Sequence, residues 1–140
     1  MPTRYLAAFA VALHAAGALA QGAPRPPIHG VSAVRIANYS APSVLVEGRA
    51  QVDAVVHELN AVRAKAGRRG DTRLACYSTL VLLKAGKPMG TFRVTAEYVV
   101  ERPVEKGEPI MSFVVGSADL PRIGQLLAEI PPNRCKPPAE

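Results

Sequence analysis

The stretch AQVDAVVHELNAVRAKA, residues 50–66, decides the fold class of this 140-residue chain. Its apolar side chains recur at spacings of three and four residues, which places them in one stripe along a helix. They are Val52, Val55, Val56, Leu59, Val62 and Ala66. The stretch therefore predicts an amphipathic helix over 50–66 that stops at Gly67 and packs one side on a hydrophobic core.

Segments with the two-residue period of a β-strand lie on both sides of this helix. Residues 31–37 and 43–47 are predicted to form two strands joined by a loop, and residues 74–83, 91–101 and 110–115 are predicted to form three more. Alternation over 91–101 places one apolar set on a common face: Phe92, Val94, Ala96, Tyr98 and Val100. The opposite face of that strand is polar, including Arg93 and Glu101, so one face of the sheet is predicted to meet water.

A second helix is predicted near the C-terminus. Ser117 or Asp119 can cap its first backbone N–H groups, and Pro121 suits its first turn. Its apolar stripe comprises Leu120, Ile123, Leu126, Leu127 and Ile130. Pro131 and Pro132 end the helix. The order ββαβββα predicts a two-layer α+β sandwich, in which a mainly antiparallel five-stranded sheet carries both helices on one face.

The N-terminal residues 1–20 have the pattern of a cleavable signal peptide. A basic start with Arg4 precedes an uncharged apolar run over 6–19, and Ala18-Leu19-Ala20 has the form of a signal-peptidase site. A membrane anchor is the alternative, but a run of about fourteen apolar residues is too short for a bilayer of roughly 30 Å. The sequence predicts export with no membrane span after cleavage.

The rest of the chain predicts one domain. Residues 21–30 have the composition of an extended Pro-rich leader, residues 31–136 form the α+β domain, and residues 137–140 are a tail. The formal net charge of the whole chain is +6, and removal of the signal peptide takes away Arg4 alone. The mature protein therefore stays basic, which favours anionic surfaces as partners.

Cys76 and Cys135 are the two cysteines of the chain. An even cysteine count in an exported protein predicts a disulfide, which points to the periplasm or the extracellular space. Closing a loop of this length stabilises a protein by about 4 kcal/mol in the chain-entropy model. A catalytic thiol is the alternative, but no activating group is visible near either cysteine.

The densest group of positive charges follows the predicted central helix. It consists of Arg63, Lys65, Arg68, Arg69 and Arg73. An anionic ligand could bind there, or the cations could simply stabilise the negative end of the helix dipole in water. Nucleic acid is not expected as a partner, because no aromatic side chains for base stacking are interleaved with these cations.

Catalytic and cofactor motifs are weak. His57 and Asp53 are four residues apart on the predicted helix, so they suit either a general base and its partner or a solvated surface pair. No metal is predicted, because the mature chain has only His29 and His57 to add to its cysteines. The glycines match no phosphate-binding or dinucleotide-binding pattern, so no cofactor is predicted.

The run of four apolar residues over 80–83 breaks the alternation expected of a strand with one wet face. It predicts either a strand that is covered on both faces or an exposed apolar patch for a partner.

These observations predict a small exported, non-catalytic binding domain that recognises a protein or an anionic ligand through its sheet face, loops or basic turn. Two alternatives stay open. One is a small extracytoplasmic enzyme using His57 with Asp53 or a reduced Cys76, and the other is a structural component of an envelope assembly.

Overall fold

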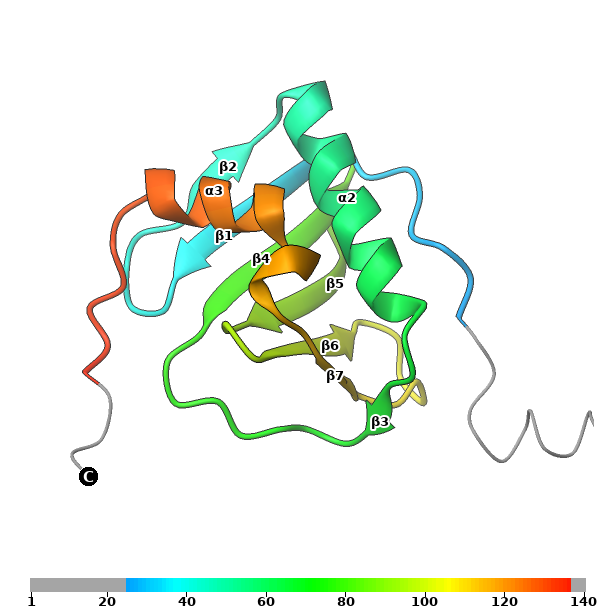
Figure 1. Ribbon diagram of the computed structural model, residues 1–140. Helices are drawn as coiled ribbons and strands as arrows, with labels where there is room; N and C mark the ends of the chain where they lie inside the picture. The colour runs from blue at the N-terminus through cyan, green and yellow to red at the C-terminus, as the bar shows by residue number, and fades with distance from the viewer. Residues whose placement is uncertain (1–24, 137–140) are drawn as a thin grey trace, which may run out of the picture.

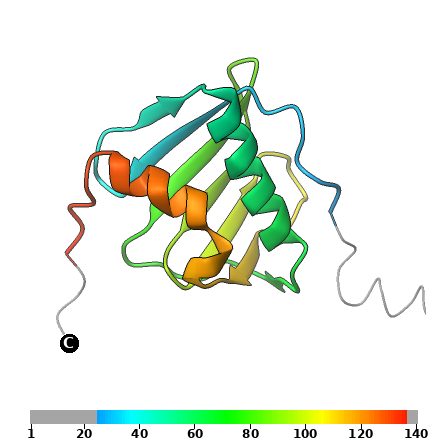
Figure 2. The same ribbon diagram turned by 45° about the horizontal axis from the view of Figure 1, so that its top comes forward.

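The computed structural model describes residues 25–136 and has two layers, a β-sheet and two α-helices that lie across one of its faces (Figures 1 and 2). The strands are β1 (Ala33–Asn38), β2 (Val44–Val46), β3 (Arg68–Arg69), β4 (Ser78–Lys84), β5 (Lys87–Val94), β6 (Tyr98–Pro103) and β7 (Met111–Val114). The helices are α2 (Arg49–Arg63) and α3 (Pro121–Glu129), with a short 3-10 helix, η1 (Ser117–Asp119), before α3.

The seven strands follow the spatial order β2-β1-β4-β5-β6-β7-β3, and neighbouring strands are antiparallel. The predicted α+β class, antiparallel sheet and two helices are confirmed. The predicted count of five strands and the order ββαβββα are wrong, because five strands instead of three separate the two helices. The predicted signal peptide, residues 1–20, and the tail, residues 137–140, lie outside the described residues.

The predicted single strand over 91–101 is two strands, β5 and β6, joined by a tight turn. The Thr95 N–H donates to the carbonyl of Tyr98 at 2.9 Å, and the Thr95 hydroxyl accepts the Tyr98 N–H at 3.0 Å. The two strands then pair so that Phe92 lies opposite Glu101. Cross-strand partners share a face, so Glu101, predicted on the wet face, lies on the helix-covered face and is buried.

A short strand that alternation did not predict, β3, lies at one edge of the sheet and pairs with β7. Its approach requires Gly67, because a Cβ at that position would lie 2.6 Å from Cε1 of Phe113 and 2.9 Å from Cε of Met111. Gly67 was predicted to stop the central helix at residue 66, but α2 ends earlier, at Arg63. Gly67 therefore lets the backbone before β3 pass close to the side chains of Phe113 and Met111.

The predicted strand over 74–83 also starts later, at Ser78 of β4. Within it, Leu80 and Leu82 face the core and are 1% exposed, while Leu83 on the other face is 4% exposed and Val81 is half-buried. The four apolar residues therefore belong to a central strand that is largely covered on both faces at this end.

The core lies between the helices and the sheet. From α2 it takes the predicted stripe at Val52, Val55, Leu59 and Val62. The strands contribute Val34, Ile36, Leu80, Leu82, Phe92, Val94, Val99 and Phe113. Ile123 of α3 and Leu120, which comes just before that helix, complete the core. This largely aliphatic packing, with Phe92 and Phe113, is the main source of stability, because buried apolar area dominates folding energetics.

Helix α3 is held at both ends by buried polar side chains from other elements. At its start, the Glu58 carboxylate of α2 accepts the backbone N–H groups of Arg122 at 2.5 Å and Ile123 at 3.0 Å. In its last turn and just after it, the Asn38 amide of β1 donates to the carbonyls of Leu127 at 3.0 Å and Pro131 at 2.9 Å. Free backbone groups at both helix ends thereby gain partners.

The chain before β1 runs beside α2 (Figure 1). The Asn60 side chain makes two hydrogen bonds to the backbone of Ile28, at 2.8 and 3.0 Å. Arg25 and Arg63 both lie 3.1 Å from the Glu101 carboxylate. A carboxylate on the covered face of the sheet is thus matched by two cations, as a buried charge requires.

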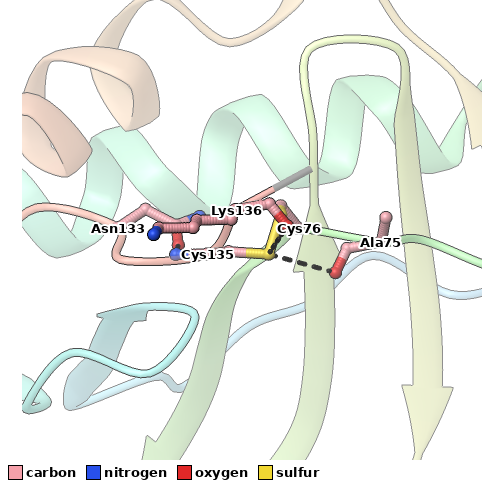
Figure 3. Close-up of a disulfide and its surroundings, with 5 residues drawn as sticks. All are labelled: Ala75, Cys76, Asn133, Cys135 and Lys136. Atoms are coloured by element: carbon pink, nitrogen blue, oxygen red, sulfur yellow. Dashed lines mark hydrogen bonds between the residues drawn. A yellow bond between two sulfur atoms is a disulfide. The ribbon is translucent and has the colours of Figure 1, made fainter. Parts of the chain in front are cut away.

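The predicted disulfide is confirmed, with a Cα–Cα distance of 5.7 Å between Cys76 and Cys135 (Figure 3). Cys76 lies two residues before β4, and Cys135 lies six residues after α3 ends at Glu129. The bridge therefore ties the chain after the last helix to the loop before a central strand, and Cys76 lies outside the strand in which the sequence had predicted it.

Candidate functional site

The sheet face opposite the helices, here called the outer face, carries the most distinctive surface chemistry. Its outward positions alternate with the core positions along each strand. One row of cross-strand partners on this face runs through Leu45, Arg35, Val81, Thr91 and Arg102 in succession. Arginines from β1 and β6 therefore stand on the same face of the sheet.

A second outward row follows one step further along the strands. Its members are Ala37, Thr79, Arg93, Val100, Ser112 and Arg68. The register thus places Arg68, from the predicted basic cluster, on the same face as Arg93, which is 25 positions later in the chain.

No outward strand position within residues 25–136 is occupied by Asp or Glu. The carboxylate of β6, Glu101, faces the helices. The four outward arginines are Arg35, Arg68, Arg93 and Arg102. The outer face therefore carries four arginines and no strand carboxylate, although it is covered at Val100 and Ser112, which are buried.

Two of these arginines are held by the segment 70–77, which crosses from β3 to β4. The Arg93 guanidinium carbon lies 4.8 Å from the centre of the Tyr77 ring, a cation–π contact. Arg102 forms a solvent-accessible ion pair with Asp71 at 3.8 Å. Arg35 is exposed and forms no ion pair within the described part of the chain.

The five cations predicted as an anion site separate into two groups. Arg63 is bonded to Glu101, with 11% of its side chain exposed, and Lys65 is bonded to Asp119 at 2.7 Å. The other three, Arg68, Arg69 and Arg73, are exposed. Two of the five predicted cations are therefore paired with carboxylates of the protein, and three are exposed for a ligand.

Arg35, Arg93 and Arg102 were not among the predicted site residues. Each lies on a different strand, so no run of charge in the sequence marks them. Alternation did place Arg93 on the polar face of its strand, but the pairing of β1, β4, β5 and β6 is needed to bring the three together.

The ion pair between Lys65 and Asp119 joins the end of α2 to η1. The hydrogen bond from Lys65 is the main cause that lowers the pKa of Asp119 below its usual 3.8, and a backbone hydrogen bond from Gly116 lowers it further. Ser117 or Asp119 was predicted to cap the last helix, but Asp119 does not. It caps the short turn before that helix, and Glu58 takes the predicted capping role.

Asp53 and His57, the pair considered as a catalytic base and its partner, are exposed to solvent. Asp53 lies 3.6 Å from Arg49 in an exposed ion pair, and His57 is exposed on the same helix. Within residues 25–136, no hydrogen bond joins His57 to Asp53, and no group of three or more His, Cys, Asp or Glu could hold a metal ion. Both cysteines are in the disulfide.

Comparisons with family models, with curated proteins and with solved structures each found no match. Among the described residues, no helix combines the length and the apolar character needed to cross a membrane. Function must therefore be inferred from the surface chemistry of the chain itself.

Proposed function

We propose that this chain is a small exported, non-catalytic binding domain that recognises an anionic ligand through the outer face of its sheet. The observation that carries the proposal is the set of outward arginines at positions 35, 68, 93 and 102, with no carboxylate at any outward strand position of the described chain. Guanidinium groups bind carboxylate, sulfate and phosphate oxygens in a bidentate manner, which suits them to this role.

Two features support export. The sequence of residues 1–20 has the three parts of a secretory signal peptide, and the disulfide between Cys76 and Cys135 is typical of oxidising compartments. The ligand is accordingly sought in the envelope or outside the cell.

The spacing of the arginines indicates the kind of anion. Arg35 and Arg102 are three strand steps apart, which corresponds to about 14 Å between their backbones. A single small anion cannot meet Arg35 and Arg102 at once. Thr91 lies between them and offers a hydroxyl for hydrogen bonding. The surface therefore suits a ligand whose negative charges are spread over a comparable length, such as an acidic polysaccharide.

The test compares two variants of the mature protein with the same change in charge. In the first, Arg35→Ala and Arg102→Ala remove two outer-face cations. In the second, Arg49→Ala and Arg122→Ala remove two cations from the helices on the opposite side. Binding to a sulfated polysaccharide is measured by calorimetry at two salt concentrations, with circular dichroism to check the fold.

We expect the outer-face variant to bind at least tenfold more weakly and the helix variant to stay within about threefold of the wild type. Binding should weaken with salt, because exposed charges are screened. Equal losses in both variants would mean that only net charge matters, and the proposal would then be wrong. Absence of binding to sulfated and carboxylated polysaccharides alike would also contradict it.

A further inference from the structure

An apolar groove lies on the helix side of the protein, between α3 and the turn that joins β5 to β6. Its volume is about 580 Å³, which is within the range of small-molecule sites. Val94, Leu120, Ile123 and Leu127 are its larger apolar side chains. It lies on the opposite side of the sheet from the outer face, so it is independent of the proposed anion site.

Of the four Ser, Thr and Gln side chains that line the groove, those of Ser78, Thr95 and Gln125 already form hydrogen bonds within the protein. The Ser78 hydroxyl donates to the side-chain oxygen of Asn38 at 2.7 Å. The Thr95 hydroxyl accepts the N–H groups of Glu97 and Tyr98. None of the described residues that line the groove is charged. An occupant must therefore be held mainly by apolar contact.

Gly124 keeps one wall of the groove open. It lies inside α3, where glycine destabilises a helix relative to alanine. Neither packing nor backbone conformation requires a glycine there, because a Cβ would meet no atom within 4 Å and its φ is not positive. The missing side chain widens the groove instead.

The disulfide brings the backbone of two cationic residues near the groove. Cys76 lines the groove, and its partner Cys135 is flanked in sequence by Arg134 and Lys136. Both flanking residues are exposed, and neither forms an ion pair with any other residue of 25–136. The backbone that carries these two cations is therefore held near the end of the uncharged groove where Cys135 is bonded to Cys76.

We propose that this groove binds a fatty acid, with the unbranched acyl chain along α3 and the carboxylate near Arg134 and Lys136. The apolar lining suits the chain, and the two cations complement the charge of the head group. The disulfide positions these cations, which gives the bridge a role in binding besides stability.

The first test is a series of saturated fatty acids, octanoate, decanoate and dodecanoate, kept below the concentrations at which they form micelles. Calorimetry on the mature, oxidised protein should show affinity rising between about two- and fourfold for each methylene until the groove is filled. Decyltrimethylammonium, which has a decyl chain and the opposite charge, should bind at least tenfold more weakly than decanoate.

Substitutions inside and outside the groove test whether decanoate binds there. Gly124→Phe and, as a second route into the groove, Ala96→Phe should abolish decanoate binding, while Glu129→Phe on the same helix but outside the groove should leave it unchanged. Arg134→Ala with Lys136→Ala should weaken decanoate binding about tenfold without lowering the melting temperature. The smaller change Gly124→Ala should raise the melting temperature.

Affinity that does not change with chain length would overturn the proposal, as would decanoate binding that survives both groove-filling changes in folded protein. Equal affinity for decanoate and decyltrimethylammonium would overturn the assignment of the head group to Arg134 and Lys136. None of these outcomes bears on the outer face, whose own test uses a polysaccharide.

Discussion

Glu58 is the residue that departs most clearly from the pattern around it. It lies on α2 between Val55 and Leu59 and is 6% exposed, although a buried carboxylate is normally costly. Two N–H groups at the start of α3 compensate it. A negative charge is also favourable at the N-terminal end of a helix, where the helix dipole is positive. The burial of Glu58 is therefore explained by its contacts with α3 and not by its place in the apolar stripe of α2.

Replacement of Glu58 by Ala should destabilise the protein by about 2 kcal/mol, because two N–H groups lose a charged partner. Urea unfolding followed by circular dichroism measures this change. Glu129→Ala, which removes an exposed carboxylate from α3, is the control and should stay within about 0.5 kcal/mol of the wild type. Equal effects of the two changes would show that Glu58 does not cap α3.

Ala85 is a second residue with an unusual environment. The turn between β4 and β5 consists of Ala85 and Gly86, with φ values of 50° and 79°. Two positive φ values define a type I′ turn, which favours Asn-Gly and strains alanine. We expect Ala85→Asn to stabilise the protein by about 1 kcal/mol, seen as a higher urea midpoint with an unchanged slope. A lower midpoint would contradict this turn assignment.

At the scale of elements, the ion pair between Lys65 and Asp119 connects the end of α2 to η1. Because the pKa of Asp119 is lowered in the folded protein, its contribution to stability is present above pH 3.8. That contribution is lost as the pH falls through the lowered folded-state value. The pairing thus helps at neutral pH and fails in acid.

The prediction for this pair concerns the pKa itself. An NMR titration of the side-chain carboxyl carbon should give Asp119 a pKa below 3.8, and Lys65→Ala should raise it, since the lysine hydrogen bond is the largest cause of the shift. Arg49→Ala, which removes a cation from the far end of α2, should leave it unchanged. A titration unaffected by the lysine change would rule out the pair in solution.

Elements with long periodic stretches could be predicted from the sequence, and short ones could not. The stripe of α2 and the strands β1 and β2 follow from side-chain spacing. The turn at residues 95–97 was missed because alternation continues through it. A strand of two residues, such as β3, has no period to detect.

At the scale of the whole molecule, the disulfide closes most of the sheet and α3 into one loop. Its sequence separation of 59 residues corresponds to a stabilisation of about 4 kcal/mol in the chain-entropy model. A protein with both Cys76→Ser and Cys135→Ser should lose stability by about that amount in urea unfolding.

The hydrophobic core does not include either cysteine, so we expect the double variant to keep the circular dichroism spectrum of the wild type. Thiol titration of the wild-type protein from its own compartment should find no free thiol before or after denaturation. A free thiol there would contradict the bridge and restore Cys76 as a candidate nucleophile.

The distribution of charge also belongs to this scale. The formal charge of +6 predicts a preference for anions without saying where they bind. In the folded chain, Arg63 and Lys65 are paired with carboxylates, whereas Arg35 on β1 comes to share a face with Arg102 on β6. The candidate site therefore differs from the charge cluster seen in the sequence.

The sequence alone determined the α+β class, the two helices, the core stripe of α2 and the pairing of Cys76 with Cys135. The class, the helices and the stripe depend on local periodicity, and two cysteines allow only one intramolecular pairing. Tertiary structure decided the seven-stranded order, the burial of Glu58 and Glu101, and the gathering of arginines on the outer face. The physical reason is that strand pairing and helix packing join residues far apart in the chain, where side-chain spacing carries no information.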